Sequence, residues 1–127
     1  MKKQVGIWID HKDAFVVFAG EGAEEPQGAE PGIAKHFRFS DHHAHDGAAE
    51  DRRDLQHATH LGKYYDEVIA YIHDAQSVLL FGPGEAKGEL EKRLEGKGLG
   101  GRIVGVETVD RMTDHQIAAK VRQHYEQ

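Results

Sequence analysis

The chain is 127 residues long, carries a formal net charge of -6 at pH 7, and contains ten histidines and no cysteine. This length predicts a single domain that spans residues 1–127, and the lack of cysteine excludes disulfides, thiolate catalysis and cysteine-based metal centres. The acidic balance argues against a protein that coats nucleic acid by bulk electrostatics, because such binding needs many Lys and Arg side chains to neutralise phosphates.

The first part of the chain predicts three strands. Residues 5–10 and 14–19 are rich in β-branched and aromatic side chains, and the polar residues between them are typical of a hairpin turn. Residues 33–39 alternate apolar and polar side chains, which predicts a third strand with one solvated face. The segment 20–32 is rich in Gly, Glu and Pro, and we expect it to be an exposed loop.

A polar segment and a long helix follow the strands. Residues 40–54 combine histidines, acids and arginines without apolar periodicity, so we expect a second exposed loop. From Leu55 onward, apolar side chains recur at spacings of three and four, which predicts a helix that ends near Ala75 and covers a sheet. The side chains on its apolar face are Leu61, Tyr65, Val68, Ile69 and Ile72.

The second half of the chain alternates strands and helices. Residues 78–81 form a continuous apolar run, which is typical of a strand buried on both faces. Residues 85–96 predict a helix, and residues 102–107 predict another strand. Thr113 and Gln116 fit a capping box that opens a final helix.

These elements follow the order β-β-β-α-β-α-β-α, which predicts an α/β fold with a mixed sheet of the ribonuclease H-like type. The longest apolar runs, such as residues 14–19, are too short to cross a bilayer. Residues 1–4 lead directly into a strand-like pattern without the features of a signal peptide. We therefore expect a cytoplasmic protein that makes no use of a membrane.

Three motifs carry a resemblance to a known family. They are residues 5–14 with the sequence VGIWIDHKDA, residues 79–87 with the sequence LLFGPGEAK, and residues 112–117 with the sequence MTDHQI. In these motifs the chain resembles the central domain of the archaeo-eukaryotic class 1 release factors and Pelota, and especially its small bacterial relatives known as translational machinery proteins. That family carries a Gly-Pro-Gly or Ser-Pro-Gly turn followed closely by Lys, an element that looks like Gly82, Pro83, Gly84 and Lys87.

The resemblance also implies a limit on activity. In release factors the loop before the long first helix carries Gly-Gly-Gln, whose glutamine works at the peptidyl-transferase centre, but residues 36–60 contain no Gly-Gly-Gln. Pelota-like proteins lack this motif and act in ribosome rescue with partner domains, which we do not expect within this chain. The resemblance therefore implies a non-enzymatic, translation-linked domain that binds the ribosome or structured RNA, alone or as a homo-oligomer.

The turn formed by Gly82, Pro83 and Gly84 has two interpretations. The backbone N–H groups of the helix N-terminus that follows it, with Lys87 on the first helical turn, suit an RNA phosphate. Alternatively Pro83 fixes φ, Gly84 supplies an unusual backbone conformation, and Glu85 complements the helix dipole without any ligand. The chain lacks the full Walker pattern, so phosphate binding at this turn is a hypothesis.

The histidines raise the question of a metal site. Imidazole is a common ligand of Zn²⁺, and two of the histidines lie one helical turn apart. A His-rich loop without a rigid frame more often binds metal adventitiously, and a solvated polar loop is the alternative. The candidate ligands of a divalent ion, Zn²⁺ or Mg²⁺, are His42, His43, His45, His57 and His60, and no other cofactor is expected.

Asp10 at the end of the first strand suggests a nuclease, because ribonuclease H enzymes place an Asp there and pair it with other acids around two metal ions. Glu67 and Asp110 are conceivable partners in a metal-dependent ribonuclease or phosphodiesterase. Nothing in their spacing makes the three carboxylates converge. Asp10 equally fits a hairpin turn in which the side chain bonds its own backbone.

Two further interpretations concern surfaces. The cations around the second helix predict either an RNA-binding patch or an ordinary solvated helix face. A small oligomeric adaptor, in which a sheet edge or a helix face pairs with another copy, is the third functional alternative. We expect Trp8 and Tyr65 in the core rather than stacked on bases. The cations of the patch are Lys87, Lys92, Arg93, Lys97 and Arg102.

Overall fold

The computed structural model describes residues 3–19, 33–39 and 50–125, and for residues 50–58 it describes the backbone alone. Within these ranges the chain forms strands and helices in the order β-β-β-α-β-α-β-α, so the predicted α/β class and order of elements are confirmed. The elements are β1 (Gln4–Ile9), β2 (Asp13–Ala19), β3 (Lys35–Arg38), α1 (Glu50–Ile72), β4 (Ser77–Gly82), α2 (Ala86–Gly96), a 3₁₀ turn (Gly100–Arg102), β5 (Ile103–Thr108) and α3 (Asp114–Tyr125).

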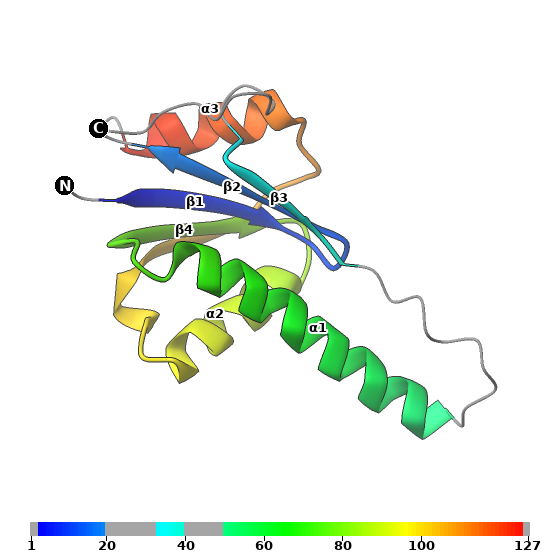
Figure 1. Ribbon diagram of the computed structural model, residues 1–127. Helices are drawn as coiled ribbons and strands as arrows, with labels where there is room; N and C mark the ends of the chain where they lie inside the picture. The colour runs from blue at the N-terminus through cyan, green and yellow to red at the C-terminus, as the bar shows by residue number, and fades with distance from the viewer. Residues whose placement is uncertain (1–2, 20–32, 40–49, 126–127) are drawn as a thin grey trace.

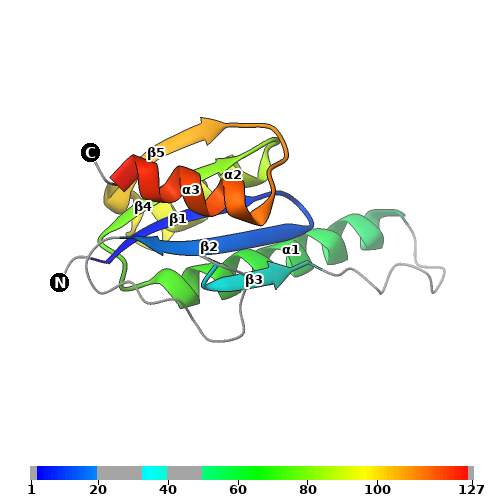
Figure 2. The ribbon, with the colours of Figure 1, turned by 90° about the horizontal axis from the view of Figure 1, so that it is seen from above.

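The strands form a mixed sheet in the order β3-β2-β1-β4-β5, with β3 and β5 at opposite edges (Figure 2). β1 is the central strand. It pairs antiparallel with β2 and parallel with β4, where Ile7 lies opposite Leu80. β4 lies between β1 and β5, so its continuous apolar run belongs to an interior strand, as predicted.

Helices cover both faces of the sheet: α1 and α2 lie on one face and α3 lies on the other (Figure 1). Because side chains alternate along a strand, neighbouring residues of β1 enter different cores. Ile7 packs with Tyr65 of α1 and Leu90 of α2. Trp8 packs on the other face with Ile117 of α3. Trp8 and Tyr65 are both buried, as predicted.

Helix α1 starts earlier than predicted. It begins at Glu50, whereas we expected the exposed loop 40–54 to continue to its end. The first turns of α1 extend beyond the sheet (Figure 1), and none of the described strands lies beneath them to favour apolar periodicity. Residues 40–49 and the expected loop 20–32 lie outside the described residues.

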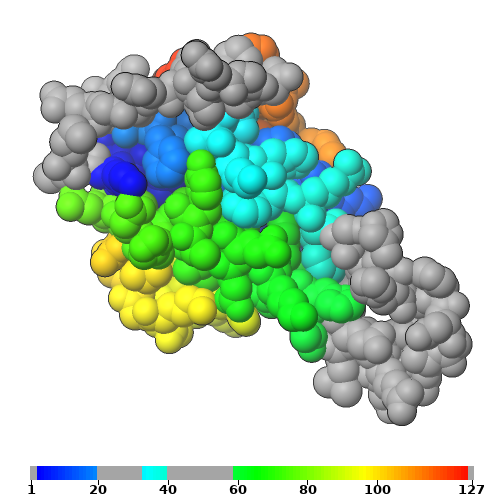
Figure 3. Space-filling model, viewed as in Figure 1, coloured from blue at the N-terminus to red at the C-terminus, as the bar shows by residue number. Residues whose placement is uncertain are grey.

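Helix α1 also forms the middle of one molecular face. In the space-filling view its surface adjoins that of β3 on one side and that of α2 on the other (Figure 3). In the described part of the chain, no helix has both the length and the apolar composition that a membrane span requires.

The last helix packs directly on the first strand. Gly6 lies beneath α3, and a Cβ atom placed there would come within 2.2 Å of Cγ2 of Val121. Glycine at this position therefore permits the close approach of helix and strand. The predicted capping box is confirmed at the start of α3, where the backbone N–H of Gln116 donates to Oγ1 of Thr113 at 3.2 Å and the N–H of Thr113 donates to Oε1 of Gln116 at 2.9 Å.

Tyr125 provides a test of this packing. Its hydroxyl donates a hydrogen bond of 2.8 Å to the carbonyl of Val5, and burial raises its pKa from 10.0 to about 12, although that hydrogen bond acts in the opposite direction. The folded chain holds the hydroxyl proton of Tyr125 more tightly than the unfolded chain. The contribution of this proton to the unfolding free energy is therefore complete below pH 10 and is lost as the pH rises through about 12. We expect the unfolding free energy of Tyr125→Phe to fall less steeply over this pH interval than that of the wild type, measured by denaturant titration. Equal slopes would contradict the buried position of the hydroxyl.

Candidate functional site

The carboxyl ends of β1, β4 and β5 meet along one rim of the sheet, because these three strands run parallel. Ligands of open α/β sheets bind at such strand ends. β1 leads into Asp10, β4 leads into the turn Gly82–Gly84, and β5 leads into Val109, whose N–H donates a hydrogen bond of 3.1 Å to the carbonyl of Gly82. We call this edge the strand-end rim.

The turn after β4 is buried at its start and exposed beyond it. A Cβ atom at Gly82 would lie 2.2 Å from the carbonyl oxygen of Ile9, so glycine allows β4 to approach β1. Gly84 is exposed, with open space around the position of a Cβ atom. Among the described glycines only Gly98 has a positive φ. The expectation that Gly84 supplies an unusual backbone conformation is therefore wrong, because the turn needs no left-handed residue there.

Lys87 lies on the first turn of α2, which begins at Ala86. Its ammonium group donates a hydrogen bond to the carbonyl of Gly84, so the side chain folds back over the turn and stays partly exposed. The helix N-terminus and this ammonium group favour an anion, whereas the exposed carboxylate of Glu85 opposes one. The turn therefore offers a phosphate a local contact, without a broad positive surface.

Asp10 is engaged in its own hairpin turn. Its Oδ1 atom accepts hydrogen bonds from the backbone N–H of Lys12 at 2.8 Å and of Asp13 at 2.7 Å, as the hairpin interpretation predicts. Glu67 is exposed on α1, and Asp110 is exposed beyond β5. Among the described residues, no three acids or histidines gather in a way that would hold a metal ion. The geometry thus does not unite Asp10 with the two acids proposed as its nuclease partners.

The sequence did not predict a network of hydrogen bonds beside the rim that joins the β1–β2 turn, α1 and α2. Oε1 of Glu89 on α2 accepts a hydrogen bond of 2.5 Å from the hydroxyl of Tyr65 and lies 3.0 Å from Nε2 of His11. The neighbouring Tyr64 donates a hydrogen bond of 3.2 Å to the carbonyl of Asp10. Burial is the main cause that raises the pKa of both tyrosines. The network joins the β1–β2 turn to both helices on this face.

Three of the five cations in the expected basic patch are bound by groups elsewhere in the structure. The guanidinium of Arg93 makes two hydrogen bonds of 2.7 and 2.9 Å to the carboxylate of Asp66, and Nζ of Lys97 lies 3.4 Å from the same group. The hydrogen bonds from Arg93 hold the pKa of Asp66 below its usual range. Arg102 donates to two backbone carbonyls just beyond α1 at 2.7 and 3.1 Å. These cations have structural partners, which disfavours the patch as a broad RNA surface.

The proposed metal ligands are only partly described. His42, His43 and His45 lie outside the described residues, and His57 is described by its backbone alone. His60 is partly exposed on α1. The metal site at these histidines stays a prediction.

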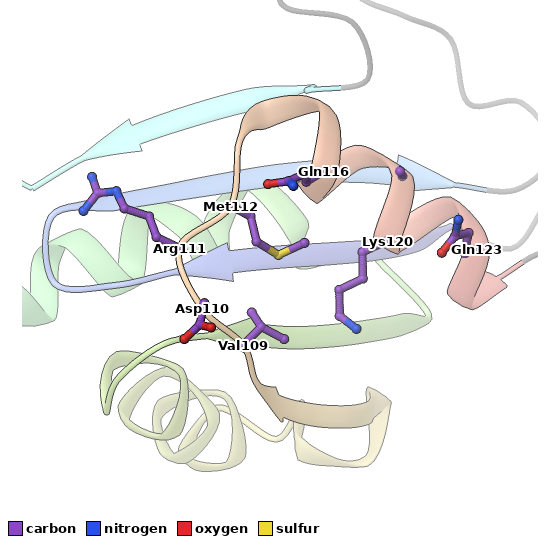
Figure 4. A pocket seen from close by; sticks show the side chains of 8 residues that line it. Val109, Asp110, Arg111, Met112, Gln116, Lys120 and Gln123 are labelled. Carbon is purple, nitrogen blue, oxygen red and sulfur yellow. The ribbon is translucent and has the colours of Figure 1, made fainter.

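A groove of about 500 Å³ opens on the α3 side of the rim (Figure 4). Lys120 extends from α3 toward the sheet, where its Nζ atom lies 2.8 Å from Oε1 of Glu107 and 5.7 Å from the ring centre of Phe81. Asp110 and Arg111 add charges of opposite sign to the lining. No periodicity in the sequence marks this groove, because its lining comes from a connecting segment and from one side of a helix.

Two glycines of one turn give a matched test of the rim. We expect Gly82→Ala to lower the unfolding free energy by roughly 3 kcal/mol, at the upper end of overpacking costs, because the new methyl group meets a backbone carbonyl that cannot move aside. Gly84→Ala should leave stability unchanged or raise it by up to about 1 kcal/mol, since its site is open and its φ is ordinary. Denaturant titration measures both values, and equal effects would contradict the close approach of β1 and β4.

The fold is similar to that of solved archaeal proteins. Pelota from Thermoplasma acidophilum matches with a TM-score of 0.59 and 12% identity over 90% of this chain. Pelota from Archaeoglobus fulgidus matches with a TM-score of 0.60 and 14% identity over 97%. An archaeal translation termination factor, aRF1, matches with a TM-score of 0.58 and 13% identity over 96%.

No protein-family model and no curated protein matches the sequence. This chain spans 30%, 31% and 37% of the length of the two Pelota proteins and aRF1, respectively. The resemblance inferred from the sequence is therefore confirmed at the level of the fold: the chain folds like one part of Pelota and aRF1.

Proposed function

We propose that this chain is a non-enzymatic, translation-linked domain that associates in the cytoplasm with the ribosome or with structured RNA. The observation that carries the proposal is the fold shared with Pelota and with a translation termination factor over at least 90% of this chain. The three sequence motifs that resemble the release-factor and Pelota family point to the same process. A shared fold can host unrelated functions, so the proposal needs a site as well.

The contact surface that we propose is the strand-end rim around Gly82, Gly84 and Lys87. The N-terminus of α2 and the ammonium group of Lys87 lie together there and suit a phosphate oxygen. The groove beneath α3 opens on the same rim and adds Arg111 and Lys120. These cations are few, and carboxylates accompany them. We therefore expect recognition of a shaped RNA surface, with little affinity for unstructured RNA.

The contacts of Asp10 at the rim support the non-enzymatic part of this proposal. The carboxylate of Asp10 holds the hairpin turn together, and the acids once considered as its partners, Glu67 and Asp110, are not gathered with it. A general acid or base needs to be within hydrogen-bond reach of its substrate, and a metal-dependent nuclease needs several ligands around one ion. No such group of metal ligands is found among the described side chains.

Charge reversal at Lys87 tests this contact surface. We expect the wild-type chain to co-sediment with ribosomes at about 50 mM salt and to dissociate progressively toward about 200 mM, because phosphate contacts release counterions. Lys87→Glu should weaken the association about tenfold, the effect of losing one charge-assisted hydrogen bond. Lys63→Glu is the matched control, since Lys63 is exposed on α1 rather than on the first turn of α2, and this variant should bind like the wild type.

Two results would count against the proposal. If wild-type protein associates with neither ribosomes nor structured RNA at low salt, the proposed function is wrong. If binding occurs but Lys87→Glu and Lys63→Glu weaken it equally, the function stands and the strand-end rim is not the contact surface.

A further inference from the structure

A second groove lies between α1 and α2, on the face of the sheet opposite α3. It has a volume of about 520 Å³, within the range of roughly 300–1,000 Å³ that small-ligand sites occupy. The surfaces of the two helices adjoin each other on this face of the molecule (Figure 3). We call it the interhelical groove, and it is lined by Leu61, Gly62 and Tyr65 from α1 and by Glu89, Lys92 and Arg93 from α2.

The guanidinium of Arg93 has a fixed orientation in this groove. Its Nε and Nη2 groups donate to the two carboxylate oxygens of Asp66 at 2.7 and 2.9 Å, a bidentate pair that sets the direction of the plane. A Cβ atom at Gly62 would lie 3.2 Å from Nη2 and 3.4 Å from both Cζ and Nη1. Because these three distances are nearly equal, a face of the guanidinium rather than its edge lies against α1. The opposite face points away from α1, and the Arg93 side chain is 42% exposed.

Gly62 permits this close approach. Glycine inside a helix is less favourable than alanine, so its place within α1 calls for a local reason. Even the Cβ atom of an alanine would come closer to Nη2 of Arg93 than an ordinary van der Waals contact. The glycine therefore lets the guanidinium lie flat on the backbone of α1 and present its other face to the groove.

The positive charge at the groove is only partly neutralised. Among the described residues, Nζ of Lys92 and Nη1 of Arg93 have no hydrogen-bond or ion-pair partner. Three cations accompany two carboxylates at or beside the groove, namely Lys92, Arg93 and Lys97 against Asp66 and Glu89. In a chain with a net charge of -6, this is a local cationic site that suits a single phosphodiester group.

We propose that the interhelical groove receives one unpaired nucleotide of the structured RNA, with its base on the open face of Arg93 and its phosphate at Lys92. Bases that have left an RNA helix stack on guanidinium planes as well as on aromatic rings. Leu61 gives the groove an apolar wall that suits a base and not a bare phosphate. The proposal rests on the proposed function and adds the feature of the RNA that is recognised, a loop or a bulge.

The groove adjoins the surface already proposed for RNA. Tyr65 and Glu89 line the groove and also belong to the hydrogen-bond network beside the strand-end rim. Lys87 and Lys92 both lie on α2. An RNA whose phosphate is bound at Lys87 therefore has the groove next to it for an adjacent unpaired nucleotide.

Nuclear magnetic resonance titration of the full chain with adenosine monophosphate (AMP) tests the groove itself. We expect a dissociation constant of about 1 mM, with the amide shifts concentrated in residues 61–65 and 89–93. Adenosine lacks the phosphate and ribose phosphate lacks the base. Each should bind roughly fivefold more weakly than AMP or worse, because each loses one of the two contacts.

Two substitutions separate the contacts. Lys92→Glu should weaken the binding of AMP about tenfold and leave that of adenosine unchanged. Arg93→Lys keeps the charge but loses the planar face, so it should weaken the binding of both by roughly fivefold or more. Lys63→Glu is the control, since Lys63 is exposed on α1 and does not line the groove. Thermal unfolding by circular dichroism verifies that each variant is folded.

Ribosome co-sedimentation of the same variants identifies the source of the nucleotide. Lys92→Glu and Arg93→Lys should each weaken the association roughly fivefold or more, and Lys63→Glu should not. If AMP shifts neither segment, or binds Arg93→Lys as tightly as the wild type, the proposal is wrong whatever the ribosome shows. If AMP binds in the groove but both variants associate with ribosomes like the wild type, the groove takes free nucleotides, which also overturns the proposal. A wild-type chain that binds AMP but neither ribosomes nor structured RNA overturns the proposed function, and with it RNA as the source of the nucleotide.

Discussion

The parallel contact between β1 and β4 is the constraint on which the rest of the structure depends. It joins residues 4–8 to residues 77–81, and at its carboxyl end the chain can come close only because Gly82 has no side chain to meet the carbonyl of Ile9. Once these strands are paired, one face of β1 is available to α1 and α2 and the other face to α3. The same contact sets the Asp10 hairpin beside the turn after β4, and so creates the rim that we propose as the functional site.

Much of the fold follows from local sequence patterns. Helical spacing identifies the buried face of α1, and the apolar run of β4 identifies an interior strand. Both patterns arise because apolar side chains occupy the buried positions of these elements. The early start of α1 was not predicted, because its first turns extend beyond the sheet (Figure 1) and their sequence shows no apolar periodicity. The conformation of Gly84 was also wrongly predicted, because glycine permits a positive φ without requiring one.

The candidate site was harder to predict because its contacts join distant segments. His11 and Glu89 are 78 residues apart, and no periodicity links them. The cations around α2 suggested a patch, but a charge pattern along one helix cannot show that Asp66 of another helix binds Arg93 and Lys97. The position of the strand-end rim can be predicted from the order of elements, because the carboxyl ends of parallel strands meet at one edge of the sheet.

The packing of α3 on β1 affects how the chain is made. β1 is synthesised well before α3, yet the hydroxyl of Tyr125 bonds the carbonyl of Val5, 120 residues earlier. Until α3 emerges from the ribosome, the sheet face that carries Trp8, Leu79 and Phe81 lacks the helix that packs on it in the folded chain. A nascent chain that has made β1 and β4 therefore carries an uncovered apolar surface until α3 is made, and such a surface favours aggregation during translation.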